Sequence, residues 1–189
     1  IDASGVVPGD VNSSSIGNLN NSFEELDILT SSDHVQSFNG GSIKTFIEDF
    51  ITGWSTTETP ENEIEIWHNN NTQDGGIHKA YHGDQFAEIN ANRNAALYFD
   101  LATVPGSLLN WSFAHKGRKG NDEISVNIGE EGAEVQQATF TTGNTTWACY
   151  DGEYTIPVDQ FTTRFQFEAI STASSISVGN FVDTVSFVL

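Results

Sequence analysis

Apolar and polar residues alternate in short runs along most of this chain. In Leu108–His115, for example, Leu109, Trp111 and Phe113 share one face. Alternation over about five to eight residues predicts half-buried antiparallel β-strands. The same pattern recurs in Glu63–Trp67, Asp84–Asn90, Ala95–Leu101, Glu123–Ile128, Glu134–Thr141, Arg164–Ile170 and Phe181–Leu189.

Residues typical of turns separate these runs. They are Asp74-Gly75-Gly76, Pro105-Gly106, the segment from Gly117 to Gly120, Gly143-Asn144 and Asp151-Gly152. Only Ile43–Ile51 has helical spacing, and it predicts a short helix or an irregular strand. The pattern therefore predicts an all-β fold, a two-sheet antiparallel β-sandwich of the jelly-roll type with at most one short helix.

Length and composition indicate one folded domain. The chain has 189 residues, of which 37% are hydrophobic, including 13 Phe and 4 Trp. This aromatic content supports a packed core. Residues 1–20 are small and polar, so they are expected to be a linker or an N-terminal tail before a domain that spans 21–189.

Two classes of localisation signal are absent from the sequence. No run of about 18 apolar residues occurs, so direct membrane insertion is not expected. No charged segment followed by an apolar one opens the chain. We therefore expect a domain cut from a larger exported, multidomain protein.

The formal net charge of −19 narrows the set of partners. A chain this acidic repels nucleic acid and anionic membranes. The carboxylates favour solubility, and they also offer the hard oxygen ligands that Ca²⁺ prefers. Cys149 is the only cysteine, which excludes an internal disulfide and a cysteine-based metal cluster.

The few basic residues are concentrated in one turn. Lys116, Arg118 and Lys119 are three of seven Lys and Arg residues, and they follow His115 between two predicted strands. Such a patch attracts an anionic group, and arginine binds a carboxylate through two parallel hydrogen bonds. The adjacent pair Asn121-Asp122 offers oxygens to a cation. The alternative is a solvated hairpin whose charges balance neighbouring acids.

A second candidate site pairs the two ends of the domain. Asn21-Ser22-Phe23-Glu24 is interpreted as opening the first strand, and Asn180-Phe181-Val182-Asp183 opens the last. Terminal strands of a sandwich commonly lie side by side, which predicts that Glu24 and Asp183 meet. A Ca²⁺ between them would remove their repulsion; the alternative is two ordinary exposed acids.

The sequence gives little support for an enzyme active site or a zinc site. His78 and His82 are spaced as metal ligands on a helix, but their segment is predicted to be a loop and no HExxH frame is present. Glu63 and Glu65 suggest a glycosidase pair, yet alternation explains them as one solvent-exposed face of a strand. No nucleophile or phosphate-binding motif occurs.

Several stretches resemble a known family. They are EIEIW at 63–67, GDQFAEINA at 83–91, WSFAHKGRKG at 111–120, NIG at 127–129, YTIP at 154–157, TRFQFEA at 163–169, GNFVDTVSF at 179–187, and the opening NSFE. Together they resemble the calcium-dependent peptide-binding domain of large bacterial RTX adhesins. The NSFE start and the FVDTVSF end also resemble jelly-roll carbohydrate-binding modules with a structural calcium.

The resemblance implies a non-catalytic cell-adhesion domain on the surface of a Gram-negative bacterium. Such domains hold the free C-termini of peptides on host or partner cells, with Ca²⁺ as the cofactor. Two segments depart from the family, 68–74 (HNNNTQD) and 31–51, and both would reshape the rim of the pocket. The candidate metal ligands are Glu24, Asp183, Asn121, Asp122 and Asp74. The candidate ligand-binding residues are His115, Lys116, Arg118, Lys119, Asn90, Tyr81 and Trp67.

Two rival functions remain open. The first is a carbohydrate-binding module in which Trp67, Tyr81 and Asn90 contact a glycan. Exposed tryptophans stack on sugars, although such rings more often fill a sandwich core. The second rival is a passive stalk module with structural calcium only.

Overall fold

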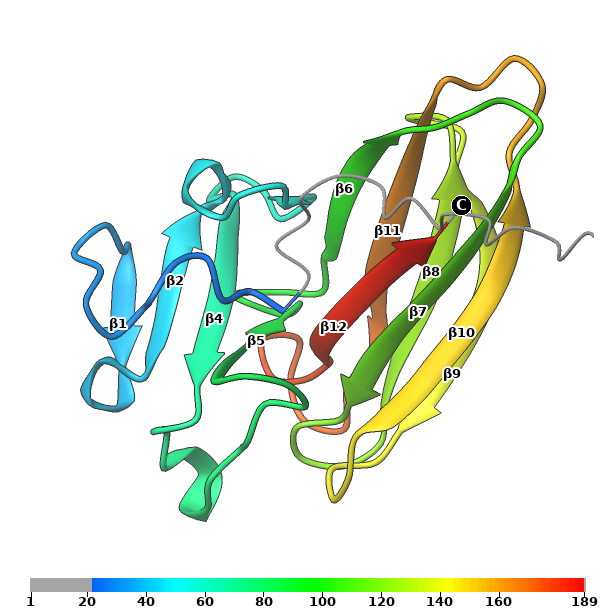
Figure 1. Cartoon of the computed structure of the whole chain (residues 1–189). Helices are drawn as coiled ribbons and strands as arrows, with labels where there is room; N and C mark the ends of the chain where they lie inside the picture. Colours follow the sequence, from blue (N-terminus) through cyan, green and yellow to red (C-terminus); the bar gives the residue numbers. More distant parts are fainter. Residues whose placement is uncertain (1–21, 189) are drawn as a thin grey trace, which may run out of the picture.

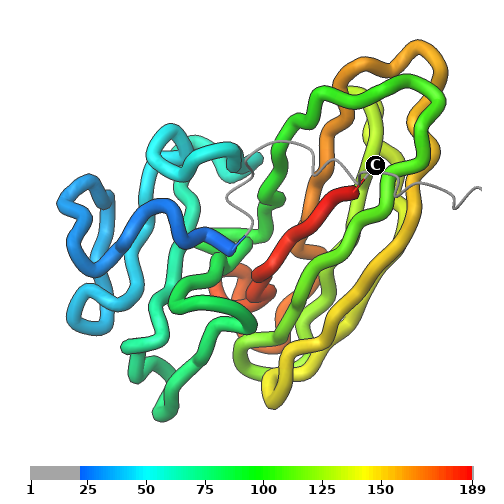
Figure 2. The backbone as a smooth tube through the Cα atoms, in the orientation of Figure 1, coloured from blue at the N-terminus to red at the C-terminus, as the bar shows by residue number. Residues whose placement is uncertain are grey.

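The computed structural model describes residues 22–188. The expected linker at 1–20 lies outside these residues. Two antiparallel sheets face each other, with β12, β7 and β10 in front of β11 and β8 (Figure 1). Figure 2 shows the C-terminal strand, in red, lying between green segments from the middle of the chain.

The first sheet has seven strands. Their spatial order is β1 (Gln36–Phe38), β2 (Ile43–Ile47), β4 (Glu63–His68), β5 (Gln85–Glu88), β12 (Phe181–Val188), β7 (Leu108–Lys116) and β10 (Ala148–Thr155). The second sheet has five strands in the order β3 (Ser55–Thr56), β6 (Ala96–Ala102), β11 (Thr162–Ser171), β8 (Asp122–Gly129) and β9 (Val135–Thr142).

Helical structure among the described residues is limited to three short 3₁₀ turns, at Asn39–Gly41, Glu48–Phe50 and Gln73–Gly75. The segment Ile43–Ile51 is therefore a strand followed by such a turn. The predicted antiparallel jelly-roll sandwich is confirmed. Across residues 22–188, no helix is long and apolar enough to cross a membrane.

The core lies between the two sheets and follows the predicted alternation. Leu109, Trp111 and Phe113 of β7 all point into it, as do Val185 and Phe187 of β12. The opposing sheet contributes residues that include Phe99, Ile124, Val126, Ile128, Phe165 and Phe167. The inner faces of both sheets are thus apolar, so any site has to lie on an outer face or at a loop.

The β10 strand was not expected from the sequence. Asp151-Gly152 was interpreted as a turn, but both residues lie within β10, and Gly152 pairs with Trp111 of β7. A Cβ at Gly152 would come within 2.2 Å of the Trp111 ring. The glycine therefore makes room for a large side chain on the neighbouring strand and does not mark a turn.

The outer face of the seven-stranded sheet carries a second, smaller apolar cluster. It consists of Ile43, Trp67, Phe86 and Phe181, with half-buried Trp147 packed against it. The connection between β4 and β5, residues 69–84, folds beside this cluster. Buried Asn71 fixes it, because its amide donates to the carbonyls of His68 and His78 and accepts from the His78 N–H.

Candidate functional site

Two loops meet at this outer face, the β4–β5 connection and the hairpin between β7 and β8. The hairpin is tightly folded, since a Cβ on Gly117 would lie 2.2 Å from the carbonyl oxygen of Gly120. Buried Asp122 holds the hairpin by accepting from the backbone N–H groups of Arg118, Ala173 and Asn180. Asp122 therefore fixes the position from which Arg118 extends.

Arg118 is the centre of the site. Its guanidinium lies over the Trp67 ring, 4.6 Å from the ring centroid. Its Nε donates to Asp74 Oδ2 at 2.8 Å, and its Nη1 donates to Glu88 Oε2 at 3.2 Å. A stacked guanidinium held by two carboxylates is rigid, because three fixed partners restrict its rotamers.

Two buried glutamates lie beneath this arginine. Glu65 of β4 and Glu88 of β5 are directly opposed across neighbouring strands, and their carboxyl groups hydrogen-bond to each other. Burial raises the pKa of Glu65 to about 7. Burial, and then the neighbouring Glu65, raise the pKa of Glu88 well above its ordinary value. The pair therefore holds a shared proton near neutral pH.

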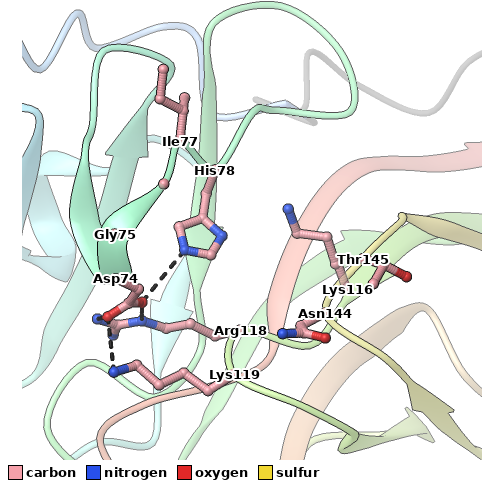
Figure 3. A pocket seen from close by; sticks show the side chains of 10 residues that line it. Asp74, Gly75, Ile77, His78, Lys116, Arg118, Lys119, Asn144 and Thr145 are labelled. Atoms are coloured by element: carbon pink, nitrogen blue, oxygen red, sulfur yellow. Dashed lines mark hydrogen bonds and ion pairs between the residues drawn. The ribbon is translucent and has the colours of Figure 1, made fainter.

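Asp74 joins the two loops. It accepts from Arg118, lies 3.0 Å from Lys119 Nζ, and lies 3.4 Å from His78 Nε2 (Figure 3). Although burial acts to raise the pKa of Asp74, hydrogen bonds from Arg118 and Lys119 hold it below its ordinary value. Burial lowers the pKa of His78, and the charge of Lys116 lowers it further.

Lys116 lies apart from this network. It ends β7 on the outer face, and its Nζ lies 5.2 Å from the Trp147 ring centroid and 5.6 Å from that of Phe181. Figure 3 shows Asp74, His78 and the Arg118 head group on one side of a cavity, with Lys116, Asn144 and Thr145 on the other.

Arg118 separates two cavities. The first, here named the Lys116 cavity, has a volume of about 430 Å³ and is lined by Asp74, His78, Lys116, Arg118, Asn144 and Thr145, among others. The second, named the Trp67 cavity, has a volume of about 580 Å³ and is lined by residues that include Ile43, Glu65, Trp67, Asn92, Arg118 and Val178. One rigid arginine thus contributes to both.

The structure brings together several residues that the sequence singled out and separates others. Arg118, Lys119, Asp74, Lys116 and Trp67 meet at the cavities. Trp67 is fully buried under the guanidinium and supports the site from below. Tyr81 is 49% exposed and lies beside Trp147, with ring centroids 6.4 Å apart.

Three other candidate residues lie away from the cavities. His115 is buried, contacts Thr142 at 2.8 Å and Asn180 at 3.0 Å, and has its pKa lowered by burial to about 4. Asn90 is also buried, and its amide donates to Asn94 and to the carbonyl of Ile176. Asn121 is exposed on the hairpin.

The arrangement of Glu24 differs from the prediction. Its segment is not a strand, and β12 lies between β5 and β7 instead of beside residues 22–24. Both acids nevertheless hold the same loop. Glu24 Oε1 accepts from the backbone of Asp84 and Gln85, and Asp183 Oδ2 accepts from that of Tyr81 and His82.

Potential metal ligands do not cluster among the described residues. Across residues 22–188, no group of three or more His, Cys, Asp or Glu side chains is placed to hold a metal ion. Asp183 is buried, and burial raises its pKa to about 7 despite donors from His82, Thr184 and Tyr81. No lysine or arginine among the described residues forms an ion pair with it.

The glutamates at the centre of the site were not among the residues predicted from the sequence. Glu63 and Glu65 were expected on a solvent-exposed face, but both are buried. On the outer face of β4, the Arg118 guanidinium lies over Trp67, and the side chains of Gln36 and Asn92 donate to the Glu63 carboxylate. The sequence does contain one indication of their position. Glu and Ile alternate before Trp67, so in a strand the two glutamates share a face with this tryptophan.

No protein-family model matches this sequence, and no curated protein sequence matches it. Among solved structures, the fold is that of jelly-roll carbohydrate-binding modules. The tandem CBM22-1–CBM22-2 domain of Paenibacillus barcinonensis Xyn10C aligns with a TM-score of 0.54 and 15% identity, over 75% of this chain and 47% of that chain.

Two single modules of the same protein align similarly. The CBM22-2 xylan-binding domain has a TM-score of 0.51 and 14% identity, over 75% of this chain and 95% of that chain. The CBM22-1 xylan-binding domain has a TM-score of 0.51 and 11% identity, over 72% and 85%. At such identities the likeness establishes the fold alone, and the resemblance to RTX adhesin domains stays a prediction.

Proposed function

We propose that this chain is a non-catalytic carbohydrate-binding module whose glycan lies on the outer face of the seven-stranded sheet, across the Lys116 and Trp67 cavities. The observation that carries the proposal is the rigid polar network around Arg118 between these two cavities, with the Trp147 ring next to Lys116, which lines the first of them. Sites for small ligands commonly combine concave shape, aromatic surface and a few fixed polar groups.

Sugars are recognised through both apolar and polar contacts. A sugar ring has apolar C–H faces that pack on aromatic rings and hydroxyl groups that need fixed donors and acceptors. Trp147 is partly exposed, and its Nε1 donates to the Lys79 carbonyl at 2.8 Å, which fixes the ring. Preorganised groups lose little conformational entropy on binding. A rigid site therefore adds little to the entropy that a flexible glycan itself loses when it binds.

The structural neighbours support the class but do not identify the ligand. The aligned modules of Xyn10C are named as xylan-binding domains. Their shared sandwich makes a β-linked polysaccharide a reasonable first probe for this chain. Fold likeness alone does not transfer specificity.

The carboxyl pair supports binding in preference to hydrolysis. Glycosidases hold two carboxyl groups at least about 5 Å apart, on either side of the scissile bond. Glu65 and Glu88 instead hydrogen-bond to each other beneath Arg118, with Glu65 also accepting from Trp67 Nε1 at 2.6 Å. No sugar fits between groups in direct contact.

The peptide-binding hypothesis placed a terminal carboxylate on Arg118. In this structure that guanidinium already donates to Asp74 and Glu88. The negative charge of these partners opposes an incoming carboxylate. Peptides with free C-termini therefore form the rival arm of the binding experiment.

Calcium and extracellular location are part of the same proposal. Asp183 is a buried carboxylate without a cationic partner among the described residues, and Glu24 holds the same loop, so a cation suits their donor chemistry. These two residues would hold a Ca²⁺ that ties the chain ends to residues 81–85. The chain would act outside the cell as a module of a larger protein.

The proposal is tested by titrating glycans by isothermal calorimetry, beginning with xylan oligosaccharides and a panel of β-linked polysaccharides. Trp147→Ala should weaken binding by about tenfold or more, as truncation of aromatic interface anchors commonly does. Phe161→Ala is the control, because that ring is 70% exposed and lies in a loop remote from both cavities. Absence of binding to every glycan, with binding to peptides that have free C-termini, would overturn the proposal.

A further inference from the structure

Lys116 has an unusual environment for a lysine. Its side chain is covered, with only 6% of the residue exposed, yet its Nζ lines the Lys116 cavity. Among residues 22–188, no hydrogen bond or ion pair reaches this nitrogen. The Trp147 and Phe181 rings face it instead, at 5.2 and 5.6 Å. A cation–π contact stabilises an ammonium only partly and supplies no acceptor for its N–H groups.

The other cations of the site form ion pairs with carboxylates. Arg118 and Lys119 contact Asp74, and Arg118 also contacts Glu88. Lys116, in contrast, forms no ion pair among residues 22–188, so it is the unpaired cation of the site.

Folding alone does not account for this arrangement. An ammonium that is largely covered and has no anionic partner lowers stability, because it loses part of its hydration and gains little in return. Burial lowers the pKa of Lys116. A methionine would fill the same space between the two rings without this cost. Residues that reduce stability in this way are typical of binding sites.

The geometry points to Lys116 as the anchor for a carboxylate of the ligand, and we propose that the glycan bound here carries an isolated uronic acid. This inference rests on the proposed glycan-binding function and specifies its ligand class. The carboxylate would lie in the Lys116 cavity, where Asn144 and Thr145 offer further polar groups on the same side as the ammonium (Figure 3).

The overall charge restricts that ligand further. With a net charge of −19, the protein repels polymers of high negative charge density at long range. A single carboxylate on an otherwise neutral chain meets Lys116 at short range and adds little long-range repulsion. We therefore expect sparsely substituted acidic glycans to bind better than polyuronates.

The test uses xylan that carries glucuronic acid branches and the same polymer after its carboxyl groups have been reduced to alcohols. Reduction removes the charge and leaves the backbone intact. The wild-type protein should bind the acidic form about 10- to 100-fold more tightly, as expected for a charge-assisted hydrogen bond. Lys116→Met should bind both forms with the weaker affinity.

Lys44→Met is the matched control. Lys44 is 5% exposed, so it is buried to the same degree, but its Nζ donates to the Ser31 carbonyl at 2.8 Å, away from both cavities. This variant should keep the preference for the acidic form. The two variants should also differ in stability. Lys116→Met should raise the Tm by roughly 2–4 °C, whereas Lys44→Met loses a hydrogen bond and should not.

The outcomes separate the two levels of the proposal. Equal binding of acidic and reduced xylan would overturn the role of Lys116 and leave the glycan-binding function standing. Tightest binding to polygalacturonate would overturn the requirement for an isolated carboxylate. Failure of all glycans to bind would overturn the function itself. Binding of peptides with free C-termini, but not of their amides, would assign the Lys116 carboxylate site to peptides instead.

Discussion

Two arginines, one packed against each sheet, make the same kind of contact in different surroundings. Arg118 lies over Trp67 and pairs with Asp74 and Glu88. Arg164 of β11 lies over Tyr98, 4.0 Å from the ring centroid, and pairs with Asp100, Glu131 and Glu134.

The two differ in their partners. Both arginine side chains are well covered, at 9% and 13% exposure, but Glu88 is fully buried whereas Glu131 is 74% exposed. Water can solvate the acids around Arg164 if the arginine is removed. It cannot reach Glu88 in the same way. Similar contacts therefore stabilise a surface at one place and compensate a buried carboxylate at the other.

Removing each arginine tests this difference. Arg118→Met should lower the free energy of unfolding by about 3–5 kcal/mol, because it leaves buried carboxylates without their cation. Arg164→Met should lower it by only about 0–1 kcal/mol. Urea unfolding at pH 7.5 measures both. Similar losses in the two variants would contradict the account.

Asp183 is a buried carboxylate without an arginine partner among the described residues, so it extends the comparison. If a Ca²⁺ replaces the missing cation there, calcium should raise the Tm by mass action, equivalent to about 2.7 kcal/mol at a hundred times its Kd. Chelator should reverse the shift. Asp183→Asn should remove most of the response, while Asp100→Asn, at the Arg164 pair, should retain it. Identical melting curves in calcium and in chelator would exclude a structural calcium.

The glutamates beneath Arg118 predict a smaller, pH-dependent effect. Because the folded pKa of Glu65 is raised from 4.5 to about 7, the folded protein holds a proton that the unfolded chain has released. This contribution to stability is present below pH 4.5 and is lost as the pH rises through 7, by at most about 1.4 kcal/mol per pH unit.

The difference in stability between a Glu65 variant and wild type isolates the contribution of the Glu65–Glu88 pair. Asp183 titrates in the same direction, whereas His115 and His78, with lowered pKa values, act in the opposite direction at acidic pH. The stability of Glu65→Gln relative to wild type should therefore increase between pH 5 and 7.5. The exposed Glu153→Gln carries the same charge change, and its curve should run parallel to wild type. A parallel curve for Glu65→Gln would show that the pair does not share a proton.

Most of the fold could be predicted from alternation, because burial of one strand face imposes a period of two. The β10 strand could not, since Gly152 has the local signature of a turn and its real cause is the Trp111 ring on the neighbouring strand. Ile43–Ile51 was ambiguous for a related reason. Its strand continues directly into a 3₁₀ turn, so neither periodicity is complete.

The site was predictable only where its residues are neighbours in the chain. The hairpin with Lys116, Arg118 and Lys119 was found because three cations stand together in an acidic sequence. The partners of Arg118 come from positions 44 and 30 residues away, so only the strand pairing brings Asp74 and Glu88 to it. Likewise, no local pattern distinguishes the paired Arg118 from the unpaired Lys116.

The indole N–H resonances of the tryptophans test most directly whether a glycan lies on the outer face of the seven-stranded sheet. The chain has 4 Trp, of which Trp54 and Trp111 lie in the core while Trp67 and Trp147 belong to the outer face. In a ¹⁵N-labelled sample, titration with glucuronic acid–substituted xylan oligosaccharides should shift the Trp147 signal most and the Trp67 signal less. The signals of Trp54 and Trp111 should stay in place. Unchanged spectra at saturating glycan, or shifts confined to the two core tryptophans, would contradict a glycan site on this face.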